Sequence, residues 1–318
     1  MDGADLELFE RSLRHATGNH TGAALDAALE ELGWRDALDV DPRAAVSLLF
    51  ELQGAANAAS SALGHVVLGA IGVEHGPGGV VLPAPGRWAP PGELRDDRLA
   101  VAGLGTAALA AQERALVVAR SDGKDVALVV PTAELALRPV EGIDPWLGLV
   151  QVTGDPIAVD TAPQPVPGWT AAVALAQVAL GHELVGAART MLDLAREHAL
   201  ERVQFGQPIS RFQAVRHRLA ETLVAIETAG AVLDAAWLDR APGTAAMAKA
   251  LAGRGARTAA RHCQQVLAGI GFTTEHVLHR YVRRVLVLDE LFGAARTLTR
   301  AQGDELLTSR TLPALLPL

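Results

Sequence analysis

The stretch "ERVQFGQPISRFQAVRHRLAE", residues 201–221, ends one helical pattern and begins another. Gly206 and Pro208 are typical of a turn between them. One interpretation is purely structural: a corner between two helices, with Phe205 as its plug. The other is functional. It assigns Arg202 to a phosphate, which a guanidinium binds through two parallel hydrogen bonds, and Phe205 to a flat ring.

A second turn follows in "QQVLAGIGFTTEH", residues 264–276. Gly269 and Gly271 interrupt the end of a helix there, and glycine lets the backbone approach a ligand closely. A simple connection between two helices would have the same sequence, so both interpretations stay open.

Long segments with helical spacing of apolar residues surround both turns. Their length and their small interior residues predict an antiparallel four-helix bundle over residues 166–318. The expected N-terminal caps of these helices are Thr170, Ser210, Thr244 and Thr274. Gly293 is the expected stop of the last helix, which reads "EHVLHRYVRRVLVLDEL".

The part before the bundle divides in two. Residues 1–75 have helical spacing, and Asp41 and Pro42 fit an N-cap and the first residue of a helix. Residues 76–165 are rich in glycine and proline and predict a small β domain. Two apolar runs flank Asp122-Gly123, a strong hairpin signal. The stretch 148–161 is expected to form another strand pair, with residues 161–169 as the linker. The fold class is therefore α+β, mainly α.

Composition restricts the classes of function. The net charge of −8 argues against nucleic acid as a partner. No stretch approaches the roughly 18 uninterrupted apolar residues of a membrane span, and the start carries acidic residues in place of a signal peptide. We therefore expect no membrane association and a cytoplasmic location. Cys263 is the only cysteine, and a buried, inert thiol is favoured over a nucleophile.

Two further motifs are weak. "GLGTAA", residues 103–108, is a fragment of a dinucleotide fingerprint that lacks its third glycine and a surrounding βαβ unit. His276 and His279 are three residues apart on one expected helix, which is more typical of surface or interface residues than of metal ligands. We expect no metal site.

Together, the two turns resemble the C-terminal signatures of the acyl-CoA dehydrogenase family. "RVQFGQPISRFQAVRHRLAE" (202–221), "MAK" (247–249) and "QVLAGIGFTTEHVLHRYVRR" (265–284) follow the family's order. The resemblance is strong over residues 170–293 and weak before them. It implies an N-terminal helical domain, a middle β domain and a C-terminal four-helix bundle, the order predicted above.

The resemblance also implies an FAD cofactor held between the subunits of a tetramer. The ADP half of one subunit's flavin lies against a neighbour's bundle in this family. Arg202 would neutralise the pyrophosphate, and Phe205 would pack on the adenosine. Gln213 and Gln265 would supply polar contacts, and Gly269 would let the backbone come close. All five positions match the family's pattern.

The implied reaction is the α,β-dehydrogenation of an acyl-CoA, in which a glutamate removes the α-proton while a hydride passes to the flavin. Counted without a gap from Gly271, the glutamate position of most members falls on Phe292. A minority carry the base on the first bundle helix, at the position of Ala176. Neither side chain can take a proton, so no catalytic residue is assigned.

Four acids lie nearby in the sequence: Glu183, Glu275, Asp289 and Glu290. Surface or helix-terminal charge is the favoured interpretation of each, and a displaced base is the alternative.

The β domain also departs from the family. The flavin-facing segments of the kind "TE…GSD" and "W-[ST]-N" have no counterpart between Gly79 and Pro165. The N-terminal domain is short. In these losses the chain resembles the shorter subunit, without the base, of bacterial α2β2 heterotetrameric acyl-CoA dehydrogenases, which are associated with bulky substrates such as CoA-linked steroid side chains. The implied partners are an acyl-CoA and a second acyl-CoA dehydrogenase subunit.

Three functional hypotheses follow. The first is an obligate subunit of a heteromeric acyl-CoA dehydrogenase whose base lies in the partner chain. The second is a self-sufficient dehydrogenase with a displaced base, such as Glu290 or Glu183. The third is a flavin-free scaffold that uses the fold for assembly.

Overall fold

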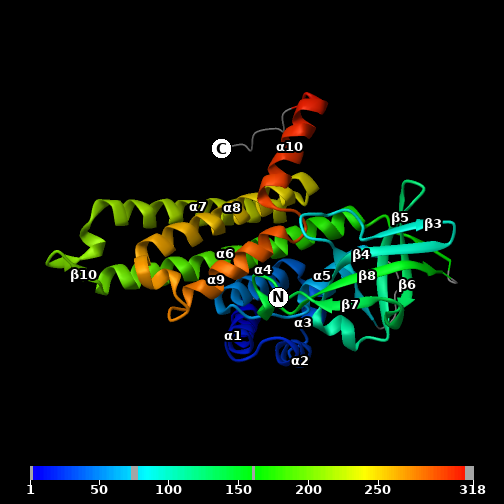
Figure 1. Ribbon diagram of the computed structural model, residues 1–318, viewed down its shortest axis with the longest axis horizontal. Coiled ribbons are helices and arrows are strands. Elements are labelled where there is room, and N and C mark those ends of the chain that lie inside the picture. The colour runs from blue at the N-terminus through cyan, green and yellow to red at the C-terminus, as the bar shows by residue number, and fades with distance from the viewer. Residues whose placement is uncertain (1–2, 73–77, 160–161, 312–318) are drawn as a thin grey trace.

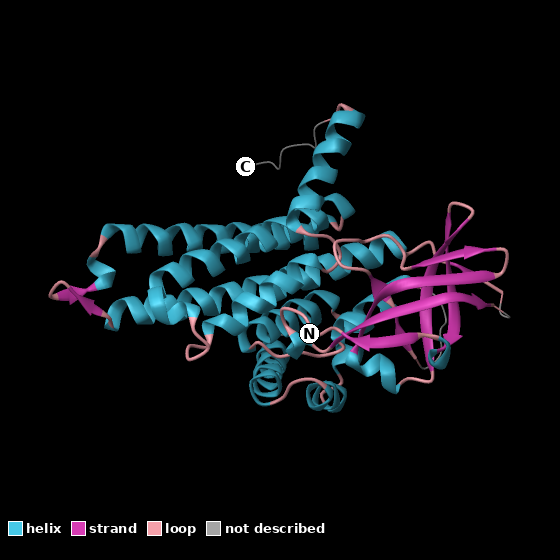
Figure 2. Ribbon diagram, in the orientation of Figure 1, coloured by secondary structure: helices cyan, strands magenta, loops and turns pink. Residues whose placement is uncertain are grey.

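The computed structural model describes residues 3–72, 78–159 and 162–311. Helices form both ends of the chain, and a sheet lies between them in the sequence (Figure 1). In space, the sheet lies at one end of a long helical body, and a small hairpin lies at the opposite end (Figure 2). The predicted class, α+β and mainly α, is confirmed.

Five helices make up the N-terminal part. They are α1 (Gly3–Asn19), α2 (Ala23–Glu31), α3 (Trp34–Val40), α4 (Pro42–Ala56) and α5 (Ala62–Ile71). The predicted cap is confirmed, because the Asp41 carboxylate accepts a hydrogen bond from the Ala44 N–H at 3.1 Å and Pro42 is the first residue of α4. Asn57 adopts a left-handed conformation, φ 52°, and ends α4.

Within the described residues the sheet has nine strands, in the order β7-β8-β4-β3-β5-β6-β9, with β1 paired to β5 and β2 paired to β4. They are β1 (Gly79–Val80), β2 (Leu82–Pro83), β3 (Gly92–Arg95), β4 (Arg98–Thr106), β5 (Arg114–Ser121), β6 (Lys124–Pro131), β7 (Ala136–Pro139), β8 (Leu149–Ala158) and β9 (Gln164–Pro165).

Both faces of β5 are buried, which explains its continuous apolar sequence. Leu116 and Val118 join the main helical core, whereas Val117 and Ala119 join a second core within the sheet. The sheet is thus fixed to the helices by alternate residues of its strands.

The hairpin prediction at Asp122-Gly123 is confirmed. Ser121 pairs with Lys124, and both loop residues have positive φ, 48° and 77°, as a two-residue loop of this kind requires. The second expected pair is wrong, because residues 149–158 form one strand, β8, that pairs with β4 and β7. β9 lies within the expected linker, and residues 160–161 of these stretches lie outside the described residues.

The bundle contains α6 (Trp169–Glu201), α7 (Gln213–Asp239), α8 (Pro242–Leu267) and α9 (Leu278–Glu290), followed by α10 (Ala295–Ser309). α10 rises away from the bundle at the end of α8 that lies nearer the sheet (Figure 1). Within the described residues, α6 alone is long and apolar enough to cross a membrane, and 89% of its most apolar window is buried. It also carries His182 and Glu183, and this burial fits a core helix.

The four expected caps of the bundle helices are wrong. α6 begins one residue before Thr170, Ser210 lies in the short turn before α7, Thr244 lies inside α8, and α9 begins four residues after Thr274. Pro242 opens α8 because its fixed φ suits a first helical residue. The His276 ring accepts the Leu278 N–H at 3.1 Å and takes the place of a hydroxyl cap at α9.

The end of α9 also differs from the prediction. The helix ends at Glu290, three residues before Gly293. Phe292 and Gly293 then both have positive φ, 52° and 100°. A Cβ on Gly293 would lie 2.8 Å from the Leu298 side chain and 2.9 Å from the Trp88 ring. Gly293 therefore allows a tight turn into α10, and it does not end the helix itself.

Candidate functional site

The turn between α6 and α7 is a small hairpin of β10 (Val203–Gln204) and β11 (Gln207–Pro208). Phe205 and Gly206 form its two-residue loop, with φ 52° and 78°. A bulky residue in the left-handed region is an outlier, and such strain collects at functional sites. The Phe205 side chain is 92% exposed, so its interpretation as a plug is wrong. It presents its ring to solvent at the tip of the bundle.

Arg202 caps the end of α6 beside this hairpin. Its carbonyl accepts the Ile209 N–H at 2.8 Å, which fixes the base of the hairpin. The residue is exposed, and no salt bridge involves its guanidinium among the described residues. Its five N–H donors are therefore available to an anion.

The other three predicted contact residues lie at the same end of the bundle. Gln213 is the first residue of α7, Gln265 lies in the last turn of α8, and Gly269 follows in a short 3₁₀ turn. Figure 1 shows the hairpin, the start of α7 and the end of α8 together at the end of the body farthest from the sheet. All three residues are exposed.

The two glycines of the second turn differ. A Cβ on Gly271 would lie 2.8 Å from the Gln264 carbonyl oxygen, so the fold itself needs that glycine. A Cβ on Gly269 would meet nothing within 4 Å, and its φ is not positive. No described residue of this chain requires a glycine at position 269. The open space beside it can accept a ligand or another subunit.

The segments that carry Phe292 and Ala176 meet in the fold, although they are far apart in the sequence. Ala176 is buried on α6, and the amide of the next residue, Gln177, donates to the Phe292 carbonyl at 3.0 Å. The Phe292 side chain is 2% exposed and packs in the main core. Both positions that the resemblance assigns to a base are therefore occupied by buried hydrocarbon side chains.

A buried network holds the turn at Phe292. Lys249 is fully buried and donates from Nζ to the Asp289 and Gly293 carbonyls at 3.0 and 3.3 Å. Burial lowers the pKa of Lys249 to about 8, against the opposing effect of Asp289. The Asp289 carboxylate accepts the Ala295 N–H at 3.0 Å and pairs with Arg257. These contacts fix the backbone on both sides of Phe292.

The nearby acids have distinct environments. Glu183 is 2% exposed and lies 3.5 Å from the Arg284 guanidinium, and burial raises the pKa of its carboxyl. Asp289 is equally buried. The interpretation of Glu183 as a surface or helix-terminal charge is wrong, because it is buried in the middle of α6. Asp289 is helix-terminal, in the last turn of α9, but it is buried and not at the surface. Glu275 is exposed in the turn before α9, and Glu290 is half-exposed and lies 3.5 Å from Arg257.

A cavity of about 440 Å³ lies between the sheet and the bundle. Gln177 reaches it, whereas Phe292 does not. Trp88, from the segment between β2 and β3, forms part of its wall and packs on Gly293. Its acids, Asp125 and Glu305, were missed from the sequence, because they lie on β6 and α10 and no local motif links them to the bundle.

Asp125 is already paired with Arg120 at 2.9 Å. None of the four acids proposed as displaced bases lines this cavity.

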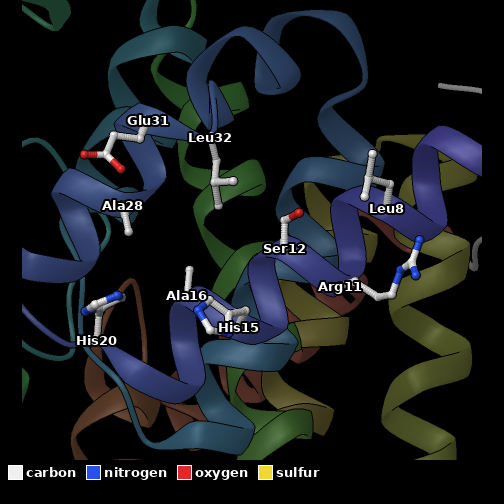
Figure 3. A pocket seen from close by; sticks show the side chains of 9 residues that line it. All are labelled: Leu8, Arg11, Ser12, His15, Ala16, His20, Ala28, Glu31 and Leu32. Atoms are coloured by element: carbon white, nitrogen blue, oxygen red, sulfur yellow. The ribbon is translucent and has the colours of Figure 1, made fainter.

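A hollow of about 660 Å³ between α1 and α2 contains none of the predicted site residues (Figure 3). His15 and His20 line it, but in the described part of the chain no three metal-binding side chains come together. Cys263 is buried and its pKa is raised to about 12, as expected of an inert thiol. The His279 ring contacts the His276 carbonyl at 2.8 Å. Residues 103–106 end β4, in an antiparallel ladder with β8, and residues 107–108 begin the 3₁₀ turn that follows.

Comparisons with known proteins agree with this architecture. Residues 168–306 match the family "Acyl-CoA dehydrogenase, C-terminal domain". The chain is 33% identical over 194 residues to acyl-CoA dehydrogenase IpdE2 of Mycobacterium tuberculosis, a match that covers 59% of each chain. The chain thus covers about three fifths of that relative's length.

Two solved structures have the same fold along nearly their whole length. One is the Tcur3481-Tcur3483 steroid ACAD G363A variant, with a TM-score of 0.75 and 22% identity over 97% of this chain and 99% of that one. The other is the ChsE4-ChsE5 complex from Mycobacterium tuberculosis, with a TM-score of 0.75 and 19% identity over 99% of both chains.

Proposed function

We propose that this chain is a subunit of a heteromeric, FAD-dependent acyl-CoA dehydrogenase. The match of residues 168–306 to the C-terminal domain of that family and the 33% identity to IpdE2 support the proposal. In this role it supplies the surface that clamps the ADP half of a flavin. The partner chain supplies the catalytic base. We call Arg202, Phe205, Gln213, Gln265 and Gly269 the flavin clamp. The observation that carries the proposal is that these five residues are exposed at one end of the bundle, whereas the expected base positions, Phe292 and Ala176, are buried.

The clamp fits the flavin's ADP half. Phe205 offers an exposed ring on a strained loop, and Arg202 offers a guanidinium free of salt bridges among the described residues. Gly269 leaves open space where a ligand's edge can approach the backbone. An aromatic ring stacks on adenine, and a guanidinium binds a pyrophosphate through paired hydrogen bonds. A bound flavin would supply the acceptor for the hydride that leaves the substrate.

The chain's own base position does not fit catalysis. The Phe292 ring is buried and the Ala176 side chain is a methyl group, so neither can remove a proton. A displaced base finds no support, because Glu183 and Asp289 are buried in salt bridges and Glu290 faces Arg257. The isolated chain should therefore be inactive.

The relatives favour a heteromer and a bulky substrate. One neighbour of the same fold is named a steroid ACAD, and the other is a complex of two named chains. We extend both properties to this chain as part of the proposal: an acyl-CoA with a bulky acyl group of the steroid side-chain type, and an α2β2 assembly with a second dehydrogenase chain.

Co-expression with an acyl-CoA dehydrogenase chain that carries its own catalytic base tests the proposal. We expect a yellow complex that oxidises an acyl-CoA, whereas this chain alone is colourless and inactive. A flavin-saturated, active oligomer of this chain alone would contradict the proposal. A colourless complex would favour the flavin-free scaffold.

A variant of the clamp sharpens the test. In Phe205→Gly the strained φ is relaxed and the ring is lost, so the chain should be as stable as the wild type or more so. The complex should nevertheless bind FAD at least about tenfold more weakly, the equivalent of one ring contact. Trp146→Ala is the matched control, because Trp146 is 75% exposed in the β domain and its loss should leave flavin binding unchanged.

A further inference from the structure

α8 carries three exposed arginines on one face. Arg254, Arg257 and Arg261 are spaced by three and four residues, which places them above one another on a helix. Gln265 continues the same face four residues later. At 1.5 Å per residue, the face from Arg254 to Gln265 is about 16 Å long. The three arginines therefore lie on the same face of α8 as Gln265, which belongs to the predicted flavin clamp.

A groove of about 920 Å³ flanks this face where α10 leaves the bundle. Arg296 and Arg300 of α10 line its other side. Figure 1 shows α10 rising from α8 there. We name the five arginines Arg254, Arg257, Arg261, Arg296 and Arg300 the arginine face.

The arginine face is only partly neutralised. Arg257 pairs with Asp289 and Glu290, the two acids of the groove. Arg300 lies 3.9 Å from Asp304, with both side chains largely exposed, a geometry that contributes little. Among the described residues, no salt bridge involves the remaining three. The groove thus carries five positive charges and two negative charges, although the whole chain has a net charge of −8.

We infer that the arginine face is the docking surface for an acidic face of the partner dehydrogenase subunit. The inference rests on the proposed function, which places the partner's flavin over Gln265 and Gly269 and so brings the partner onto this side of α8. Charge complementarity then identifies the partner's contribution as carboxylates. Guanidinium groups bind these through paired hydrogen bonds and retain their charge at any physiological pH.

The same charges act against a symmetric dimer of this chain. In a two-fold dimer whose axis passes through this face, the patch would meet its own copy, so arginines would face arginines. Like charges across an interface are strongly unfavourable, whereas opposite charges speed association and select the partner. The arginine face thus favours the heteromer over the homomer.

Charge reversal tests the inference. The wild type and the double variant Arg254→Glu/Arg261→Glu are each mixed with the base-carrying dehydrogenase chain that pairs with the wild type in the co-expression test, and the dissociation constant is measured at low and high salt. We expect at least about a 100-fold loss of affinity at low salt, since two attractive contacts become repulsive. We expect the wild-type affinity to fall as salt rises, and that of the variant to change little or improve.

Arg138→Glu is the matched control, because Arg138 is exposed on β7 in the sheet. An unchanged affinity in this control, with circular dichroism and melting temperature unchanged in all variants, assigns the loss to the arginine face. Wild-type affinity in the double variant would overturn the inference and leave the proposed function intact. A wild-type chain that never pairs would overturn both. Intact pairing with lost flavin would show that these arginines bind flavin phosphates and not the partner, which also overturns the inference.

Discussion

Lys249 is a charged group that the fold buries completely beside Phe292. Its two hydrogen-bond partners are backbone carbonyls, and Asp289 opposes but does not cancel the cost of burial, so the pKa lies at about 8 against an ordinary 10.5. Between these two pH values the unfolded chain holds the proton and the folded chain does not. The contribution of Lys249 to the free energy of unfolding should therefore rise with pH in this window.

Comparison of the wild type with Lys249→Met isolates this effect. Between pH of about 7.5 and 9.5, we expect the wild type to gain about 2 kcal/mol relative to the variant. Urea unfolding at both pH values measures it. The variant lacks the two hydrogen bonds that Lys249 donates to buried carbonyls, but the free-energy cost of losing them does not depend on pH. A stability difference that stays constant across the window would contradict the expected depression of the pKa.

At the scale of single residues, the sequence predicts which residues belong to the site better than it predicts their backbone conformations. It identifies Phe205 as a candidate ring contact and Phe292 as a position that cannot take a proton. It cannot show that both residues adopt a left-handed φ of 52°, because that conformation depends on the turns around them. It also misplaces Glu183, and it misses that both Glu183 and the helix-terminal Asp289 are buried, since their arginine partners come from distant segments.

At the scale of elements, a pair of glycines sets how closely α4 and α6 approach. A Cβ on Gly54 would lie 2.0 Å from the Glu183 carbonyl oxygen, and one on Gly186 would lie 2.0 Å from the Glu51 carbonyl oxygen. Both clashes involve backbone, which cannot move aside without separating the helices. The crossing therefore requires glycine on both helices.

Gly54→Ala and Gly186→Ala should each lower the free energy of unfolding by at least about 2 kcal/mol, the usual scale of overpacking. Gly69→Ala on α5 is the control, because a Cβ there meets nothing within 4 Å. Alanine has the higher helix propensity, so this control should be stabilised by up to about 1 kcal/mol. Urea unfolding compares the three, and equal stabilities would show that the helices cross less closely.

Element types follow from the sequence, but helix starts do not. The hairpin at Asp122-Gly123 and the cap at Asp41 are encoded by neighbouring residues, and both are confirmed. The hydroxyl caps of the bundle helices are wrong because tertiary packing and Pro242 determine those starts. β8 looked like two strands because Gly154 and Pro156 resemble a turn, yet its pairing with β4 continues past them with a register shift.

At the scale of the whole molecule, Arg284 joins the sheet domain to both sets of helices. This α9 residue is fully buried and pairs with Asp144 at 2.6 Å and with Glu183 of α6 at 3.5 Å. It also donates to the Ala58 carbonyl after α4 at 2.6 Å. Residues from four distant parts of the chain thus meet at one guanidinium, a convergence that no local pattern in the sequence could reveal.

Arg284→Met should be strongly destabilising, by about 3–5 kcal/mol, because two carboxylates would remain buried without a cation. Arg283→Met is the control on the exposed side of the same helix, where a change within about 0.5 kcal/mol is expected. Adding Asp144→Asn and Glu183→Gln to Arg284→Met should recover part of the loss, since no uncompensated charge then stays buried.

Urea unfolding with separate probes of the sheet and the bundle measures both the stability of the chain and the coupling between its sheet and its helices. If Arg284 ties the domains together, the two probes should separate in the single variant. Coincident transitions at wild-type stability would show instead that packing alone joins the sheet to the helices.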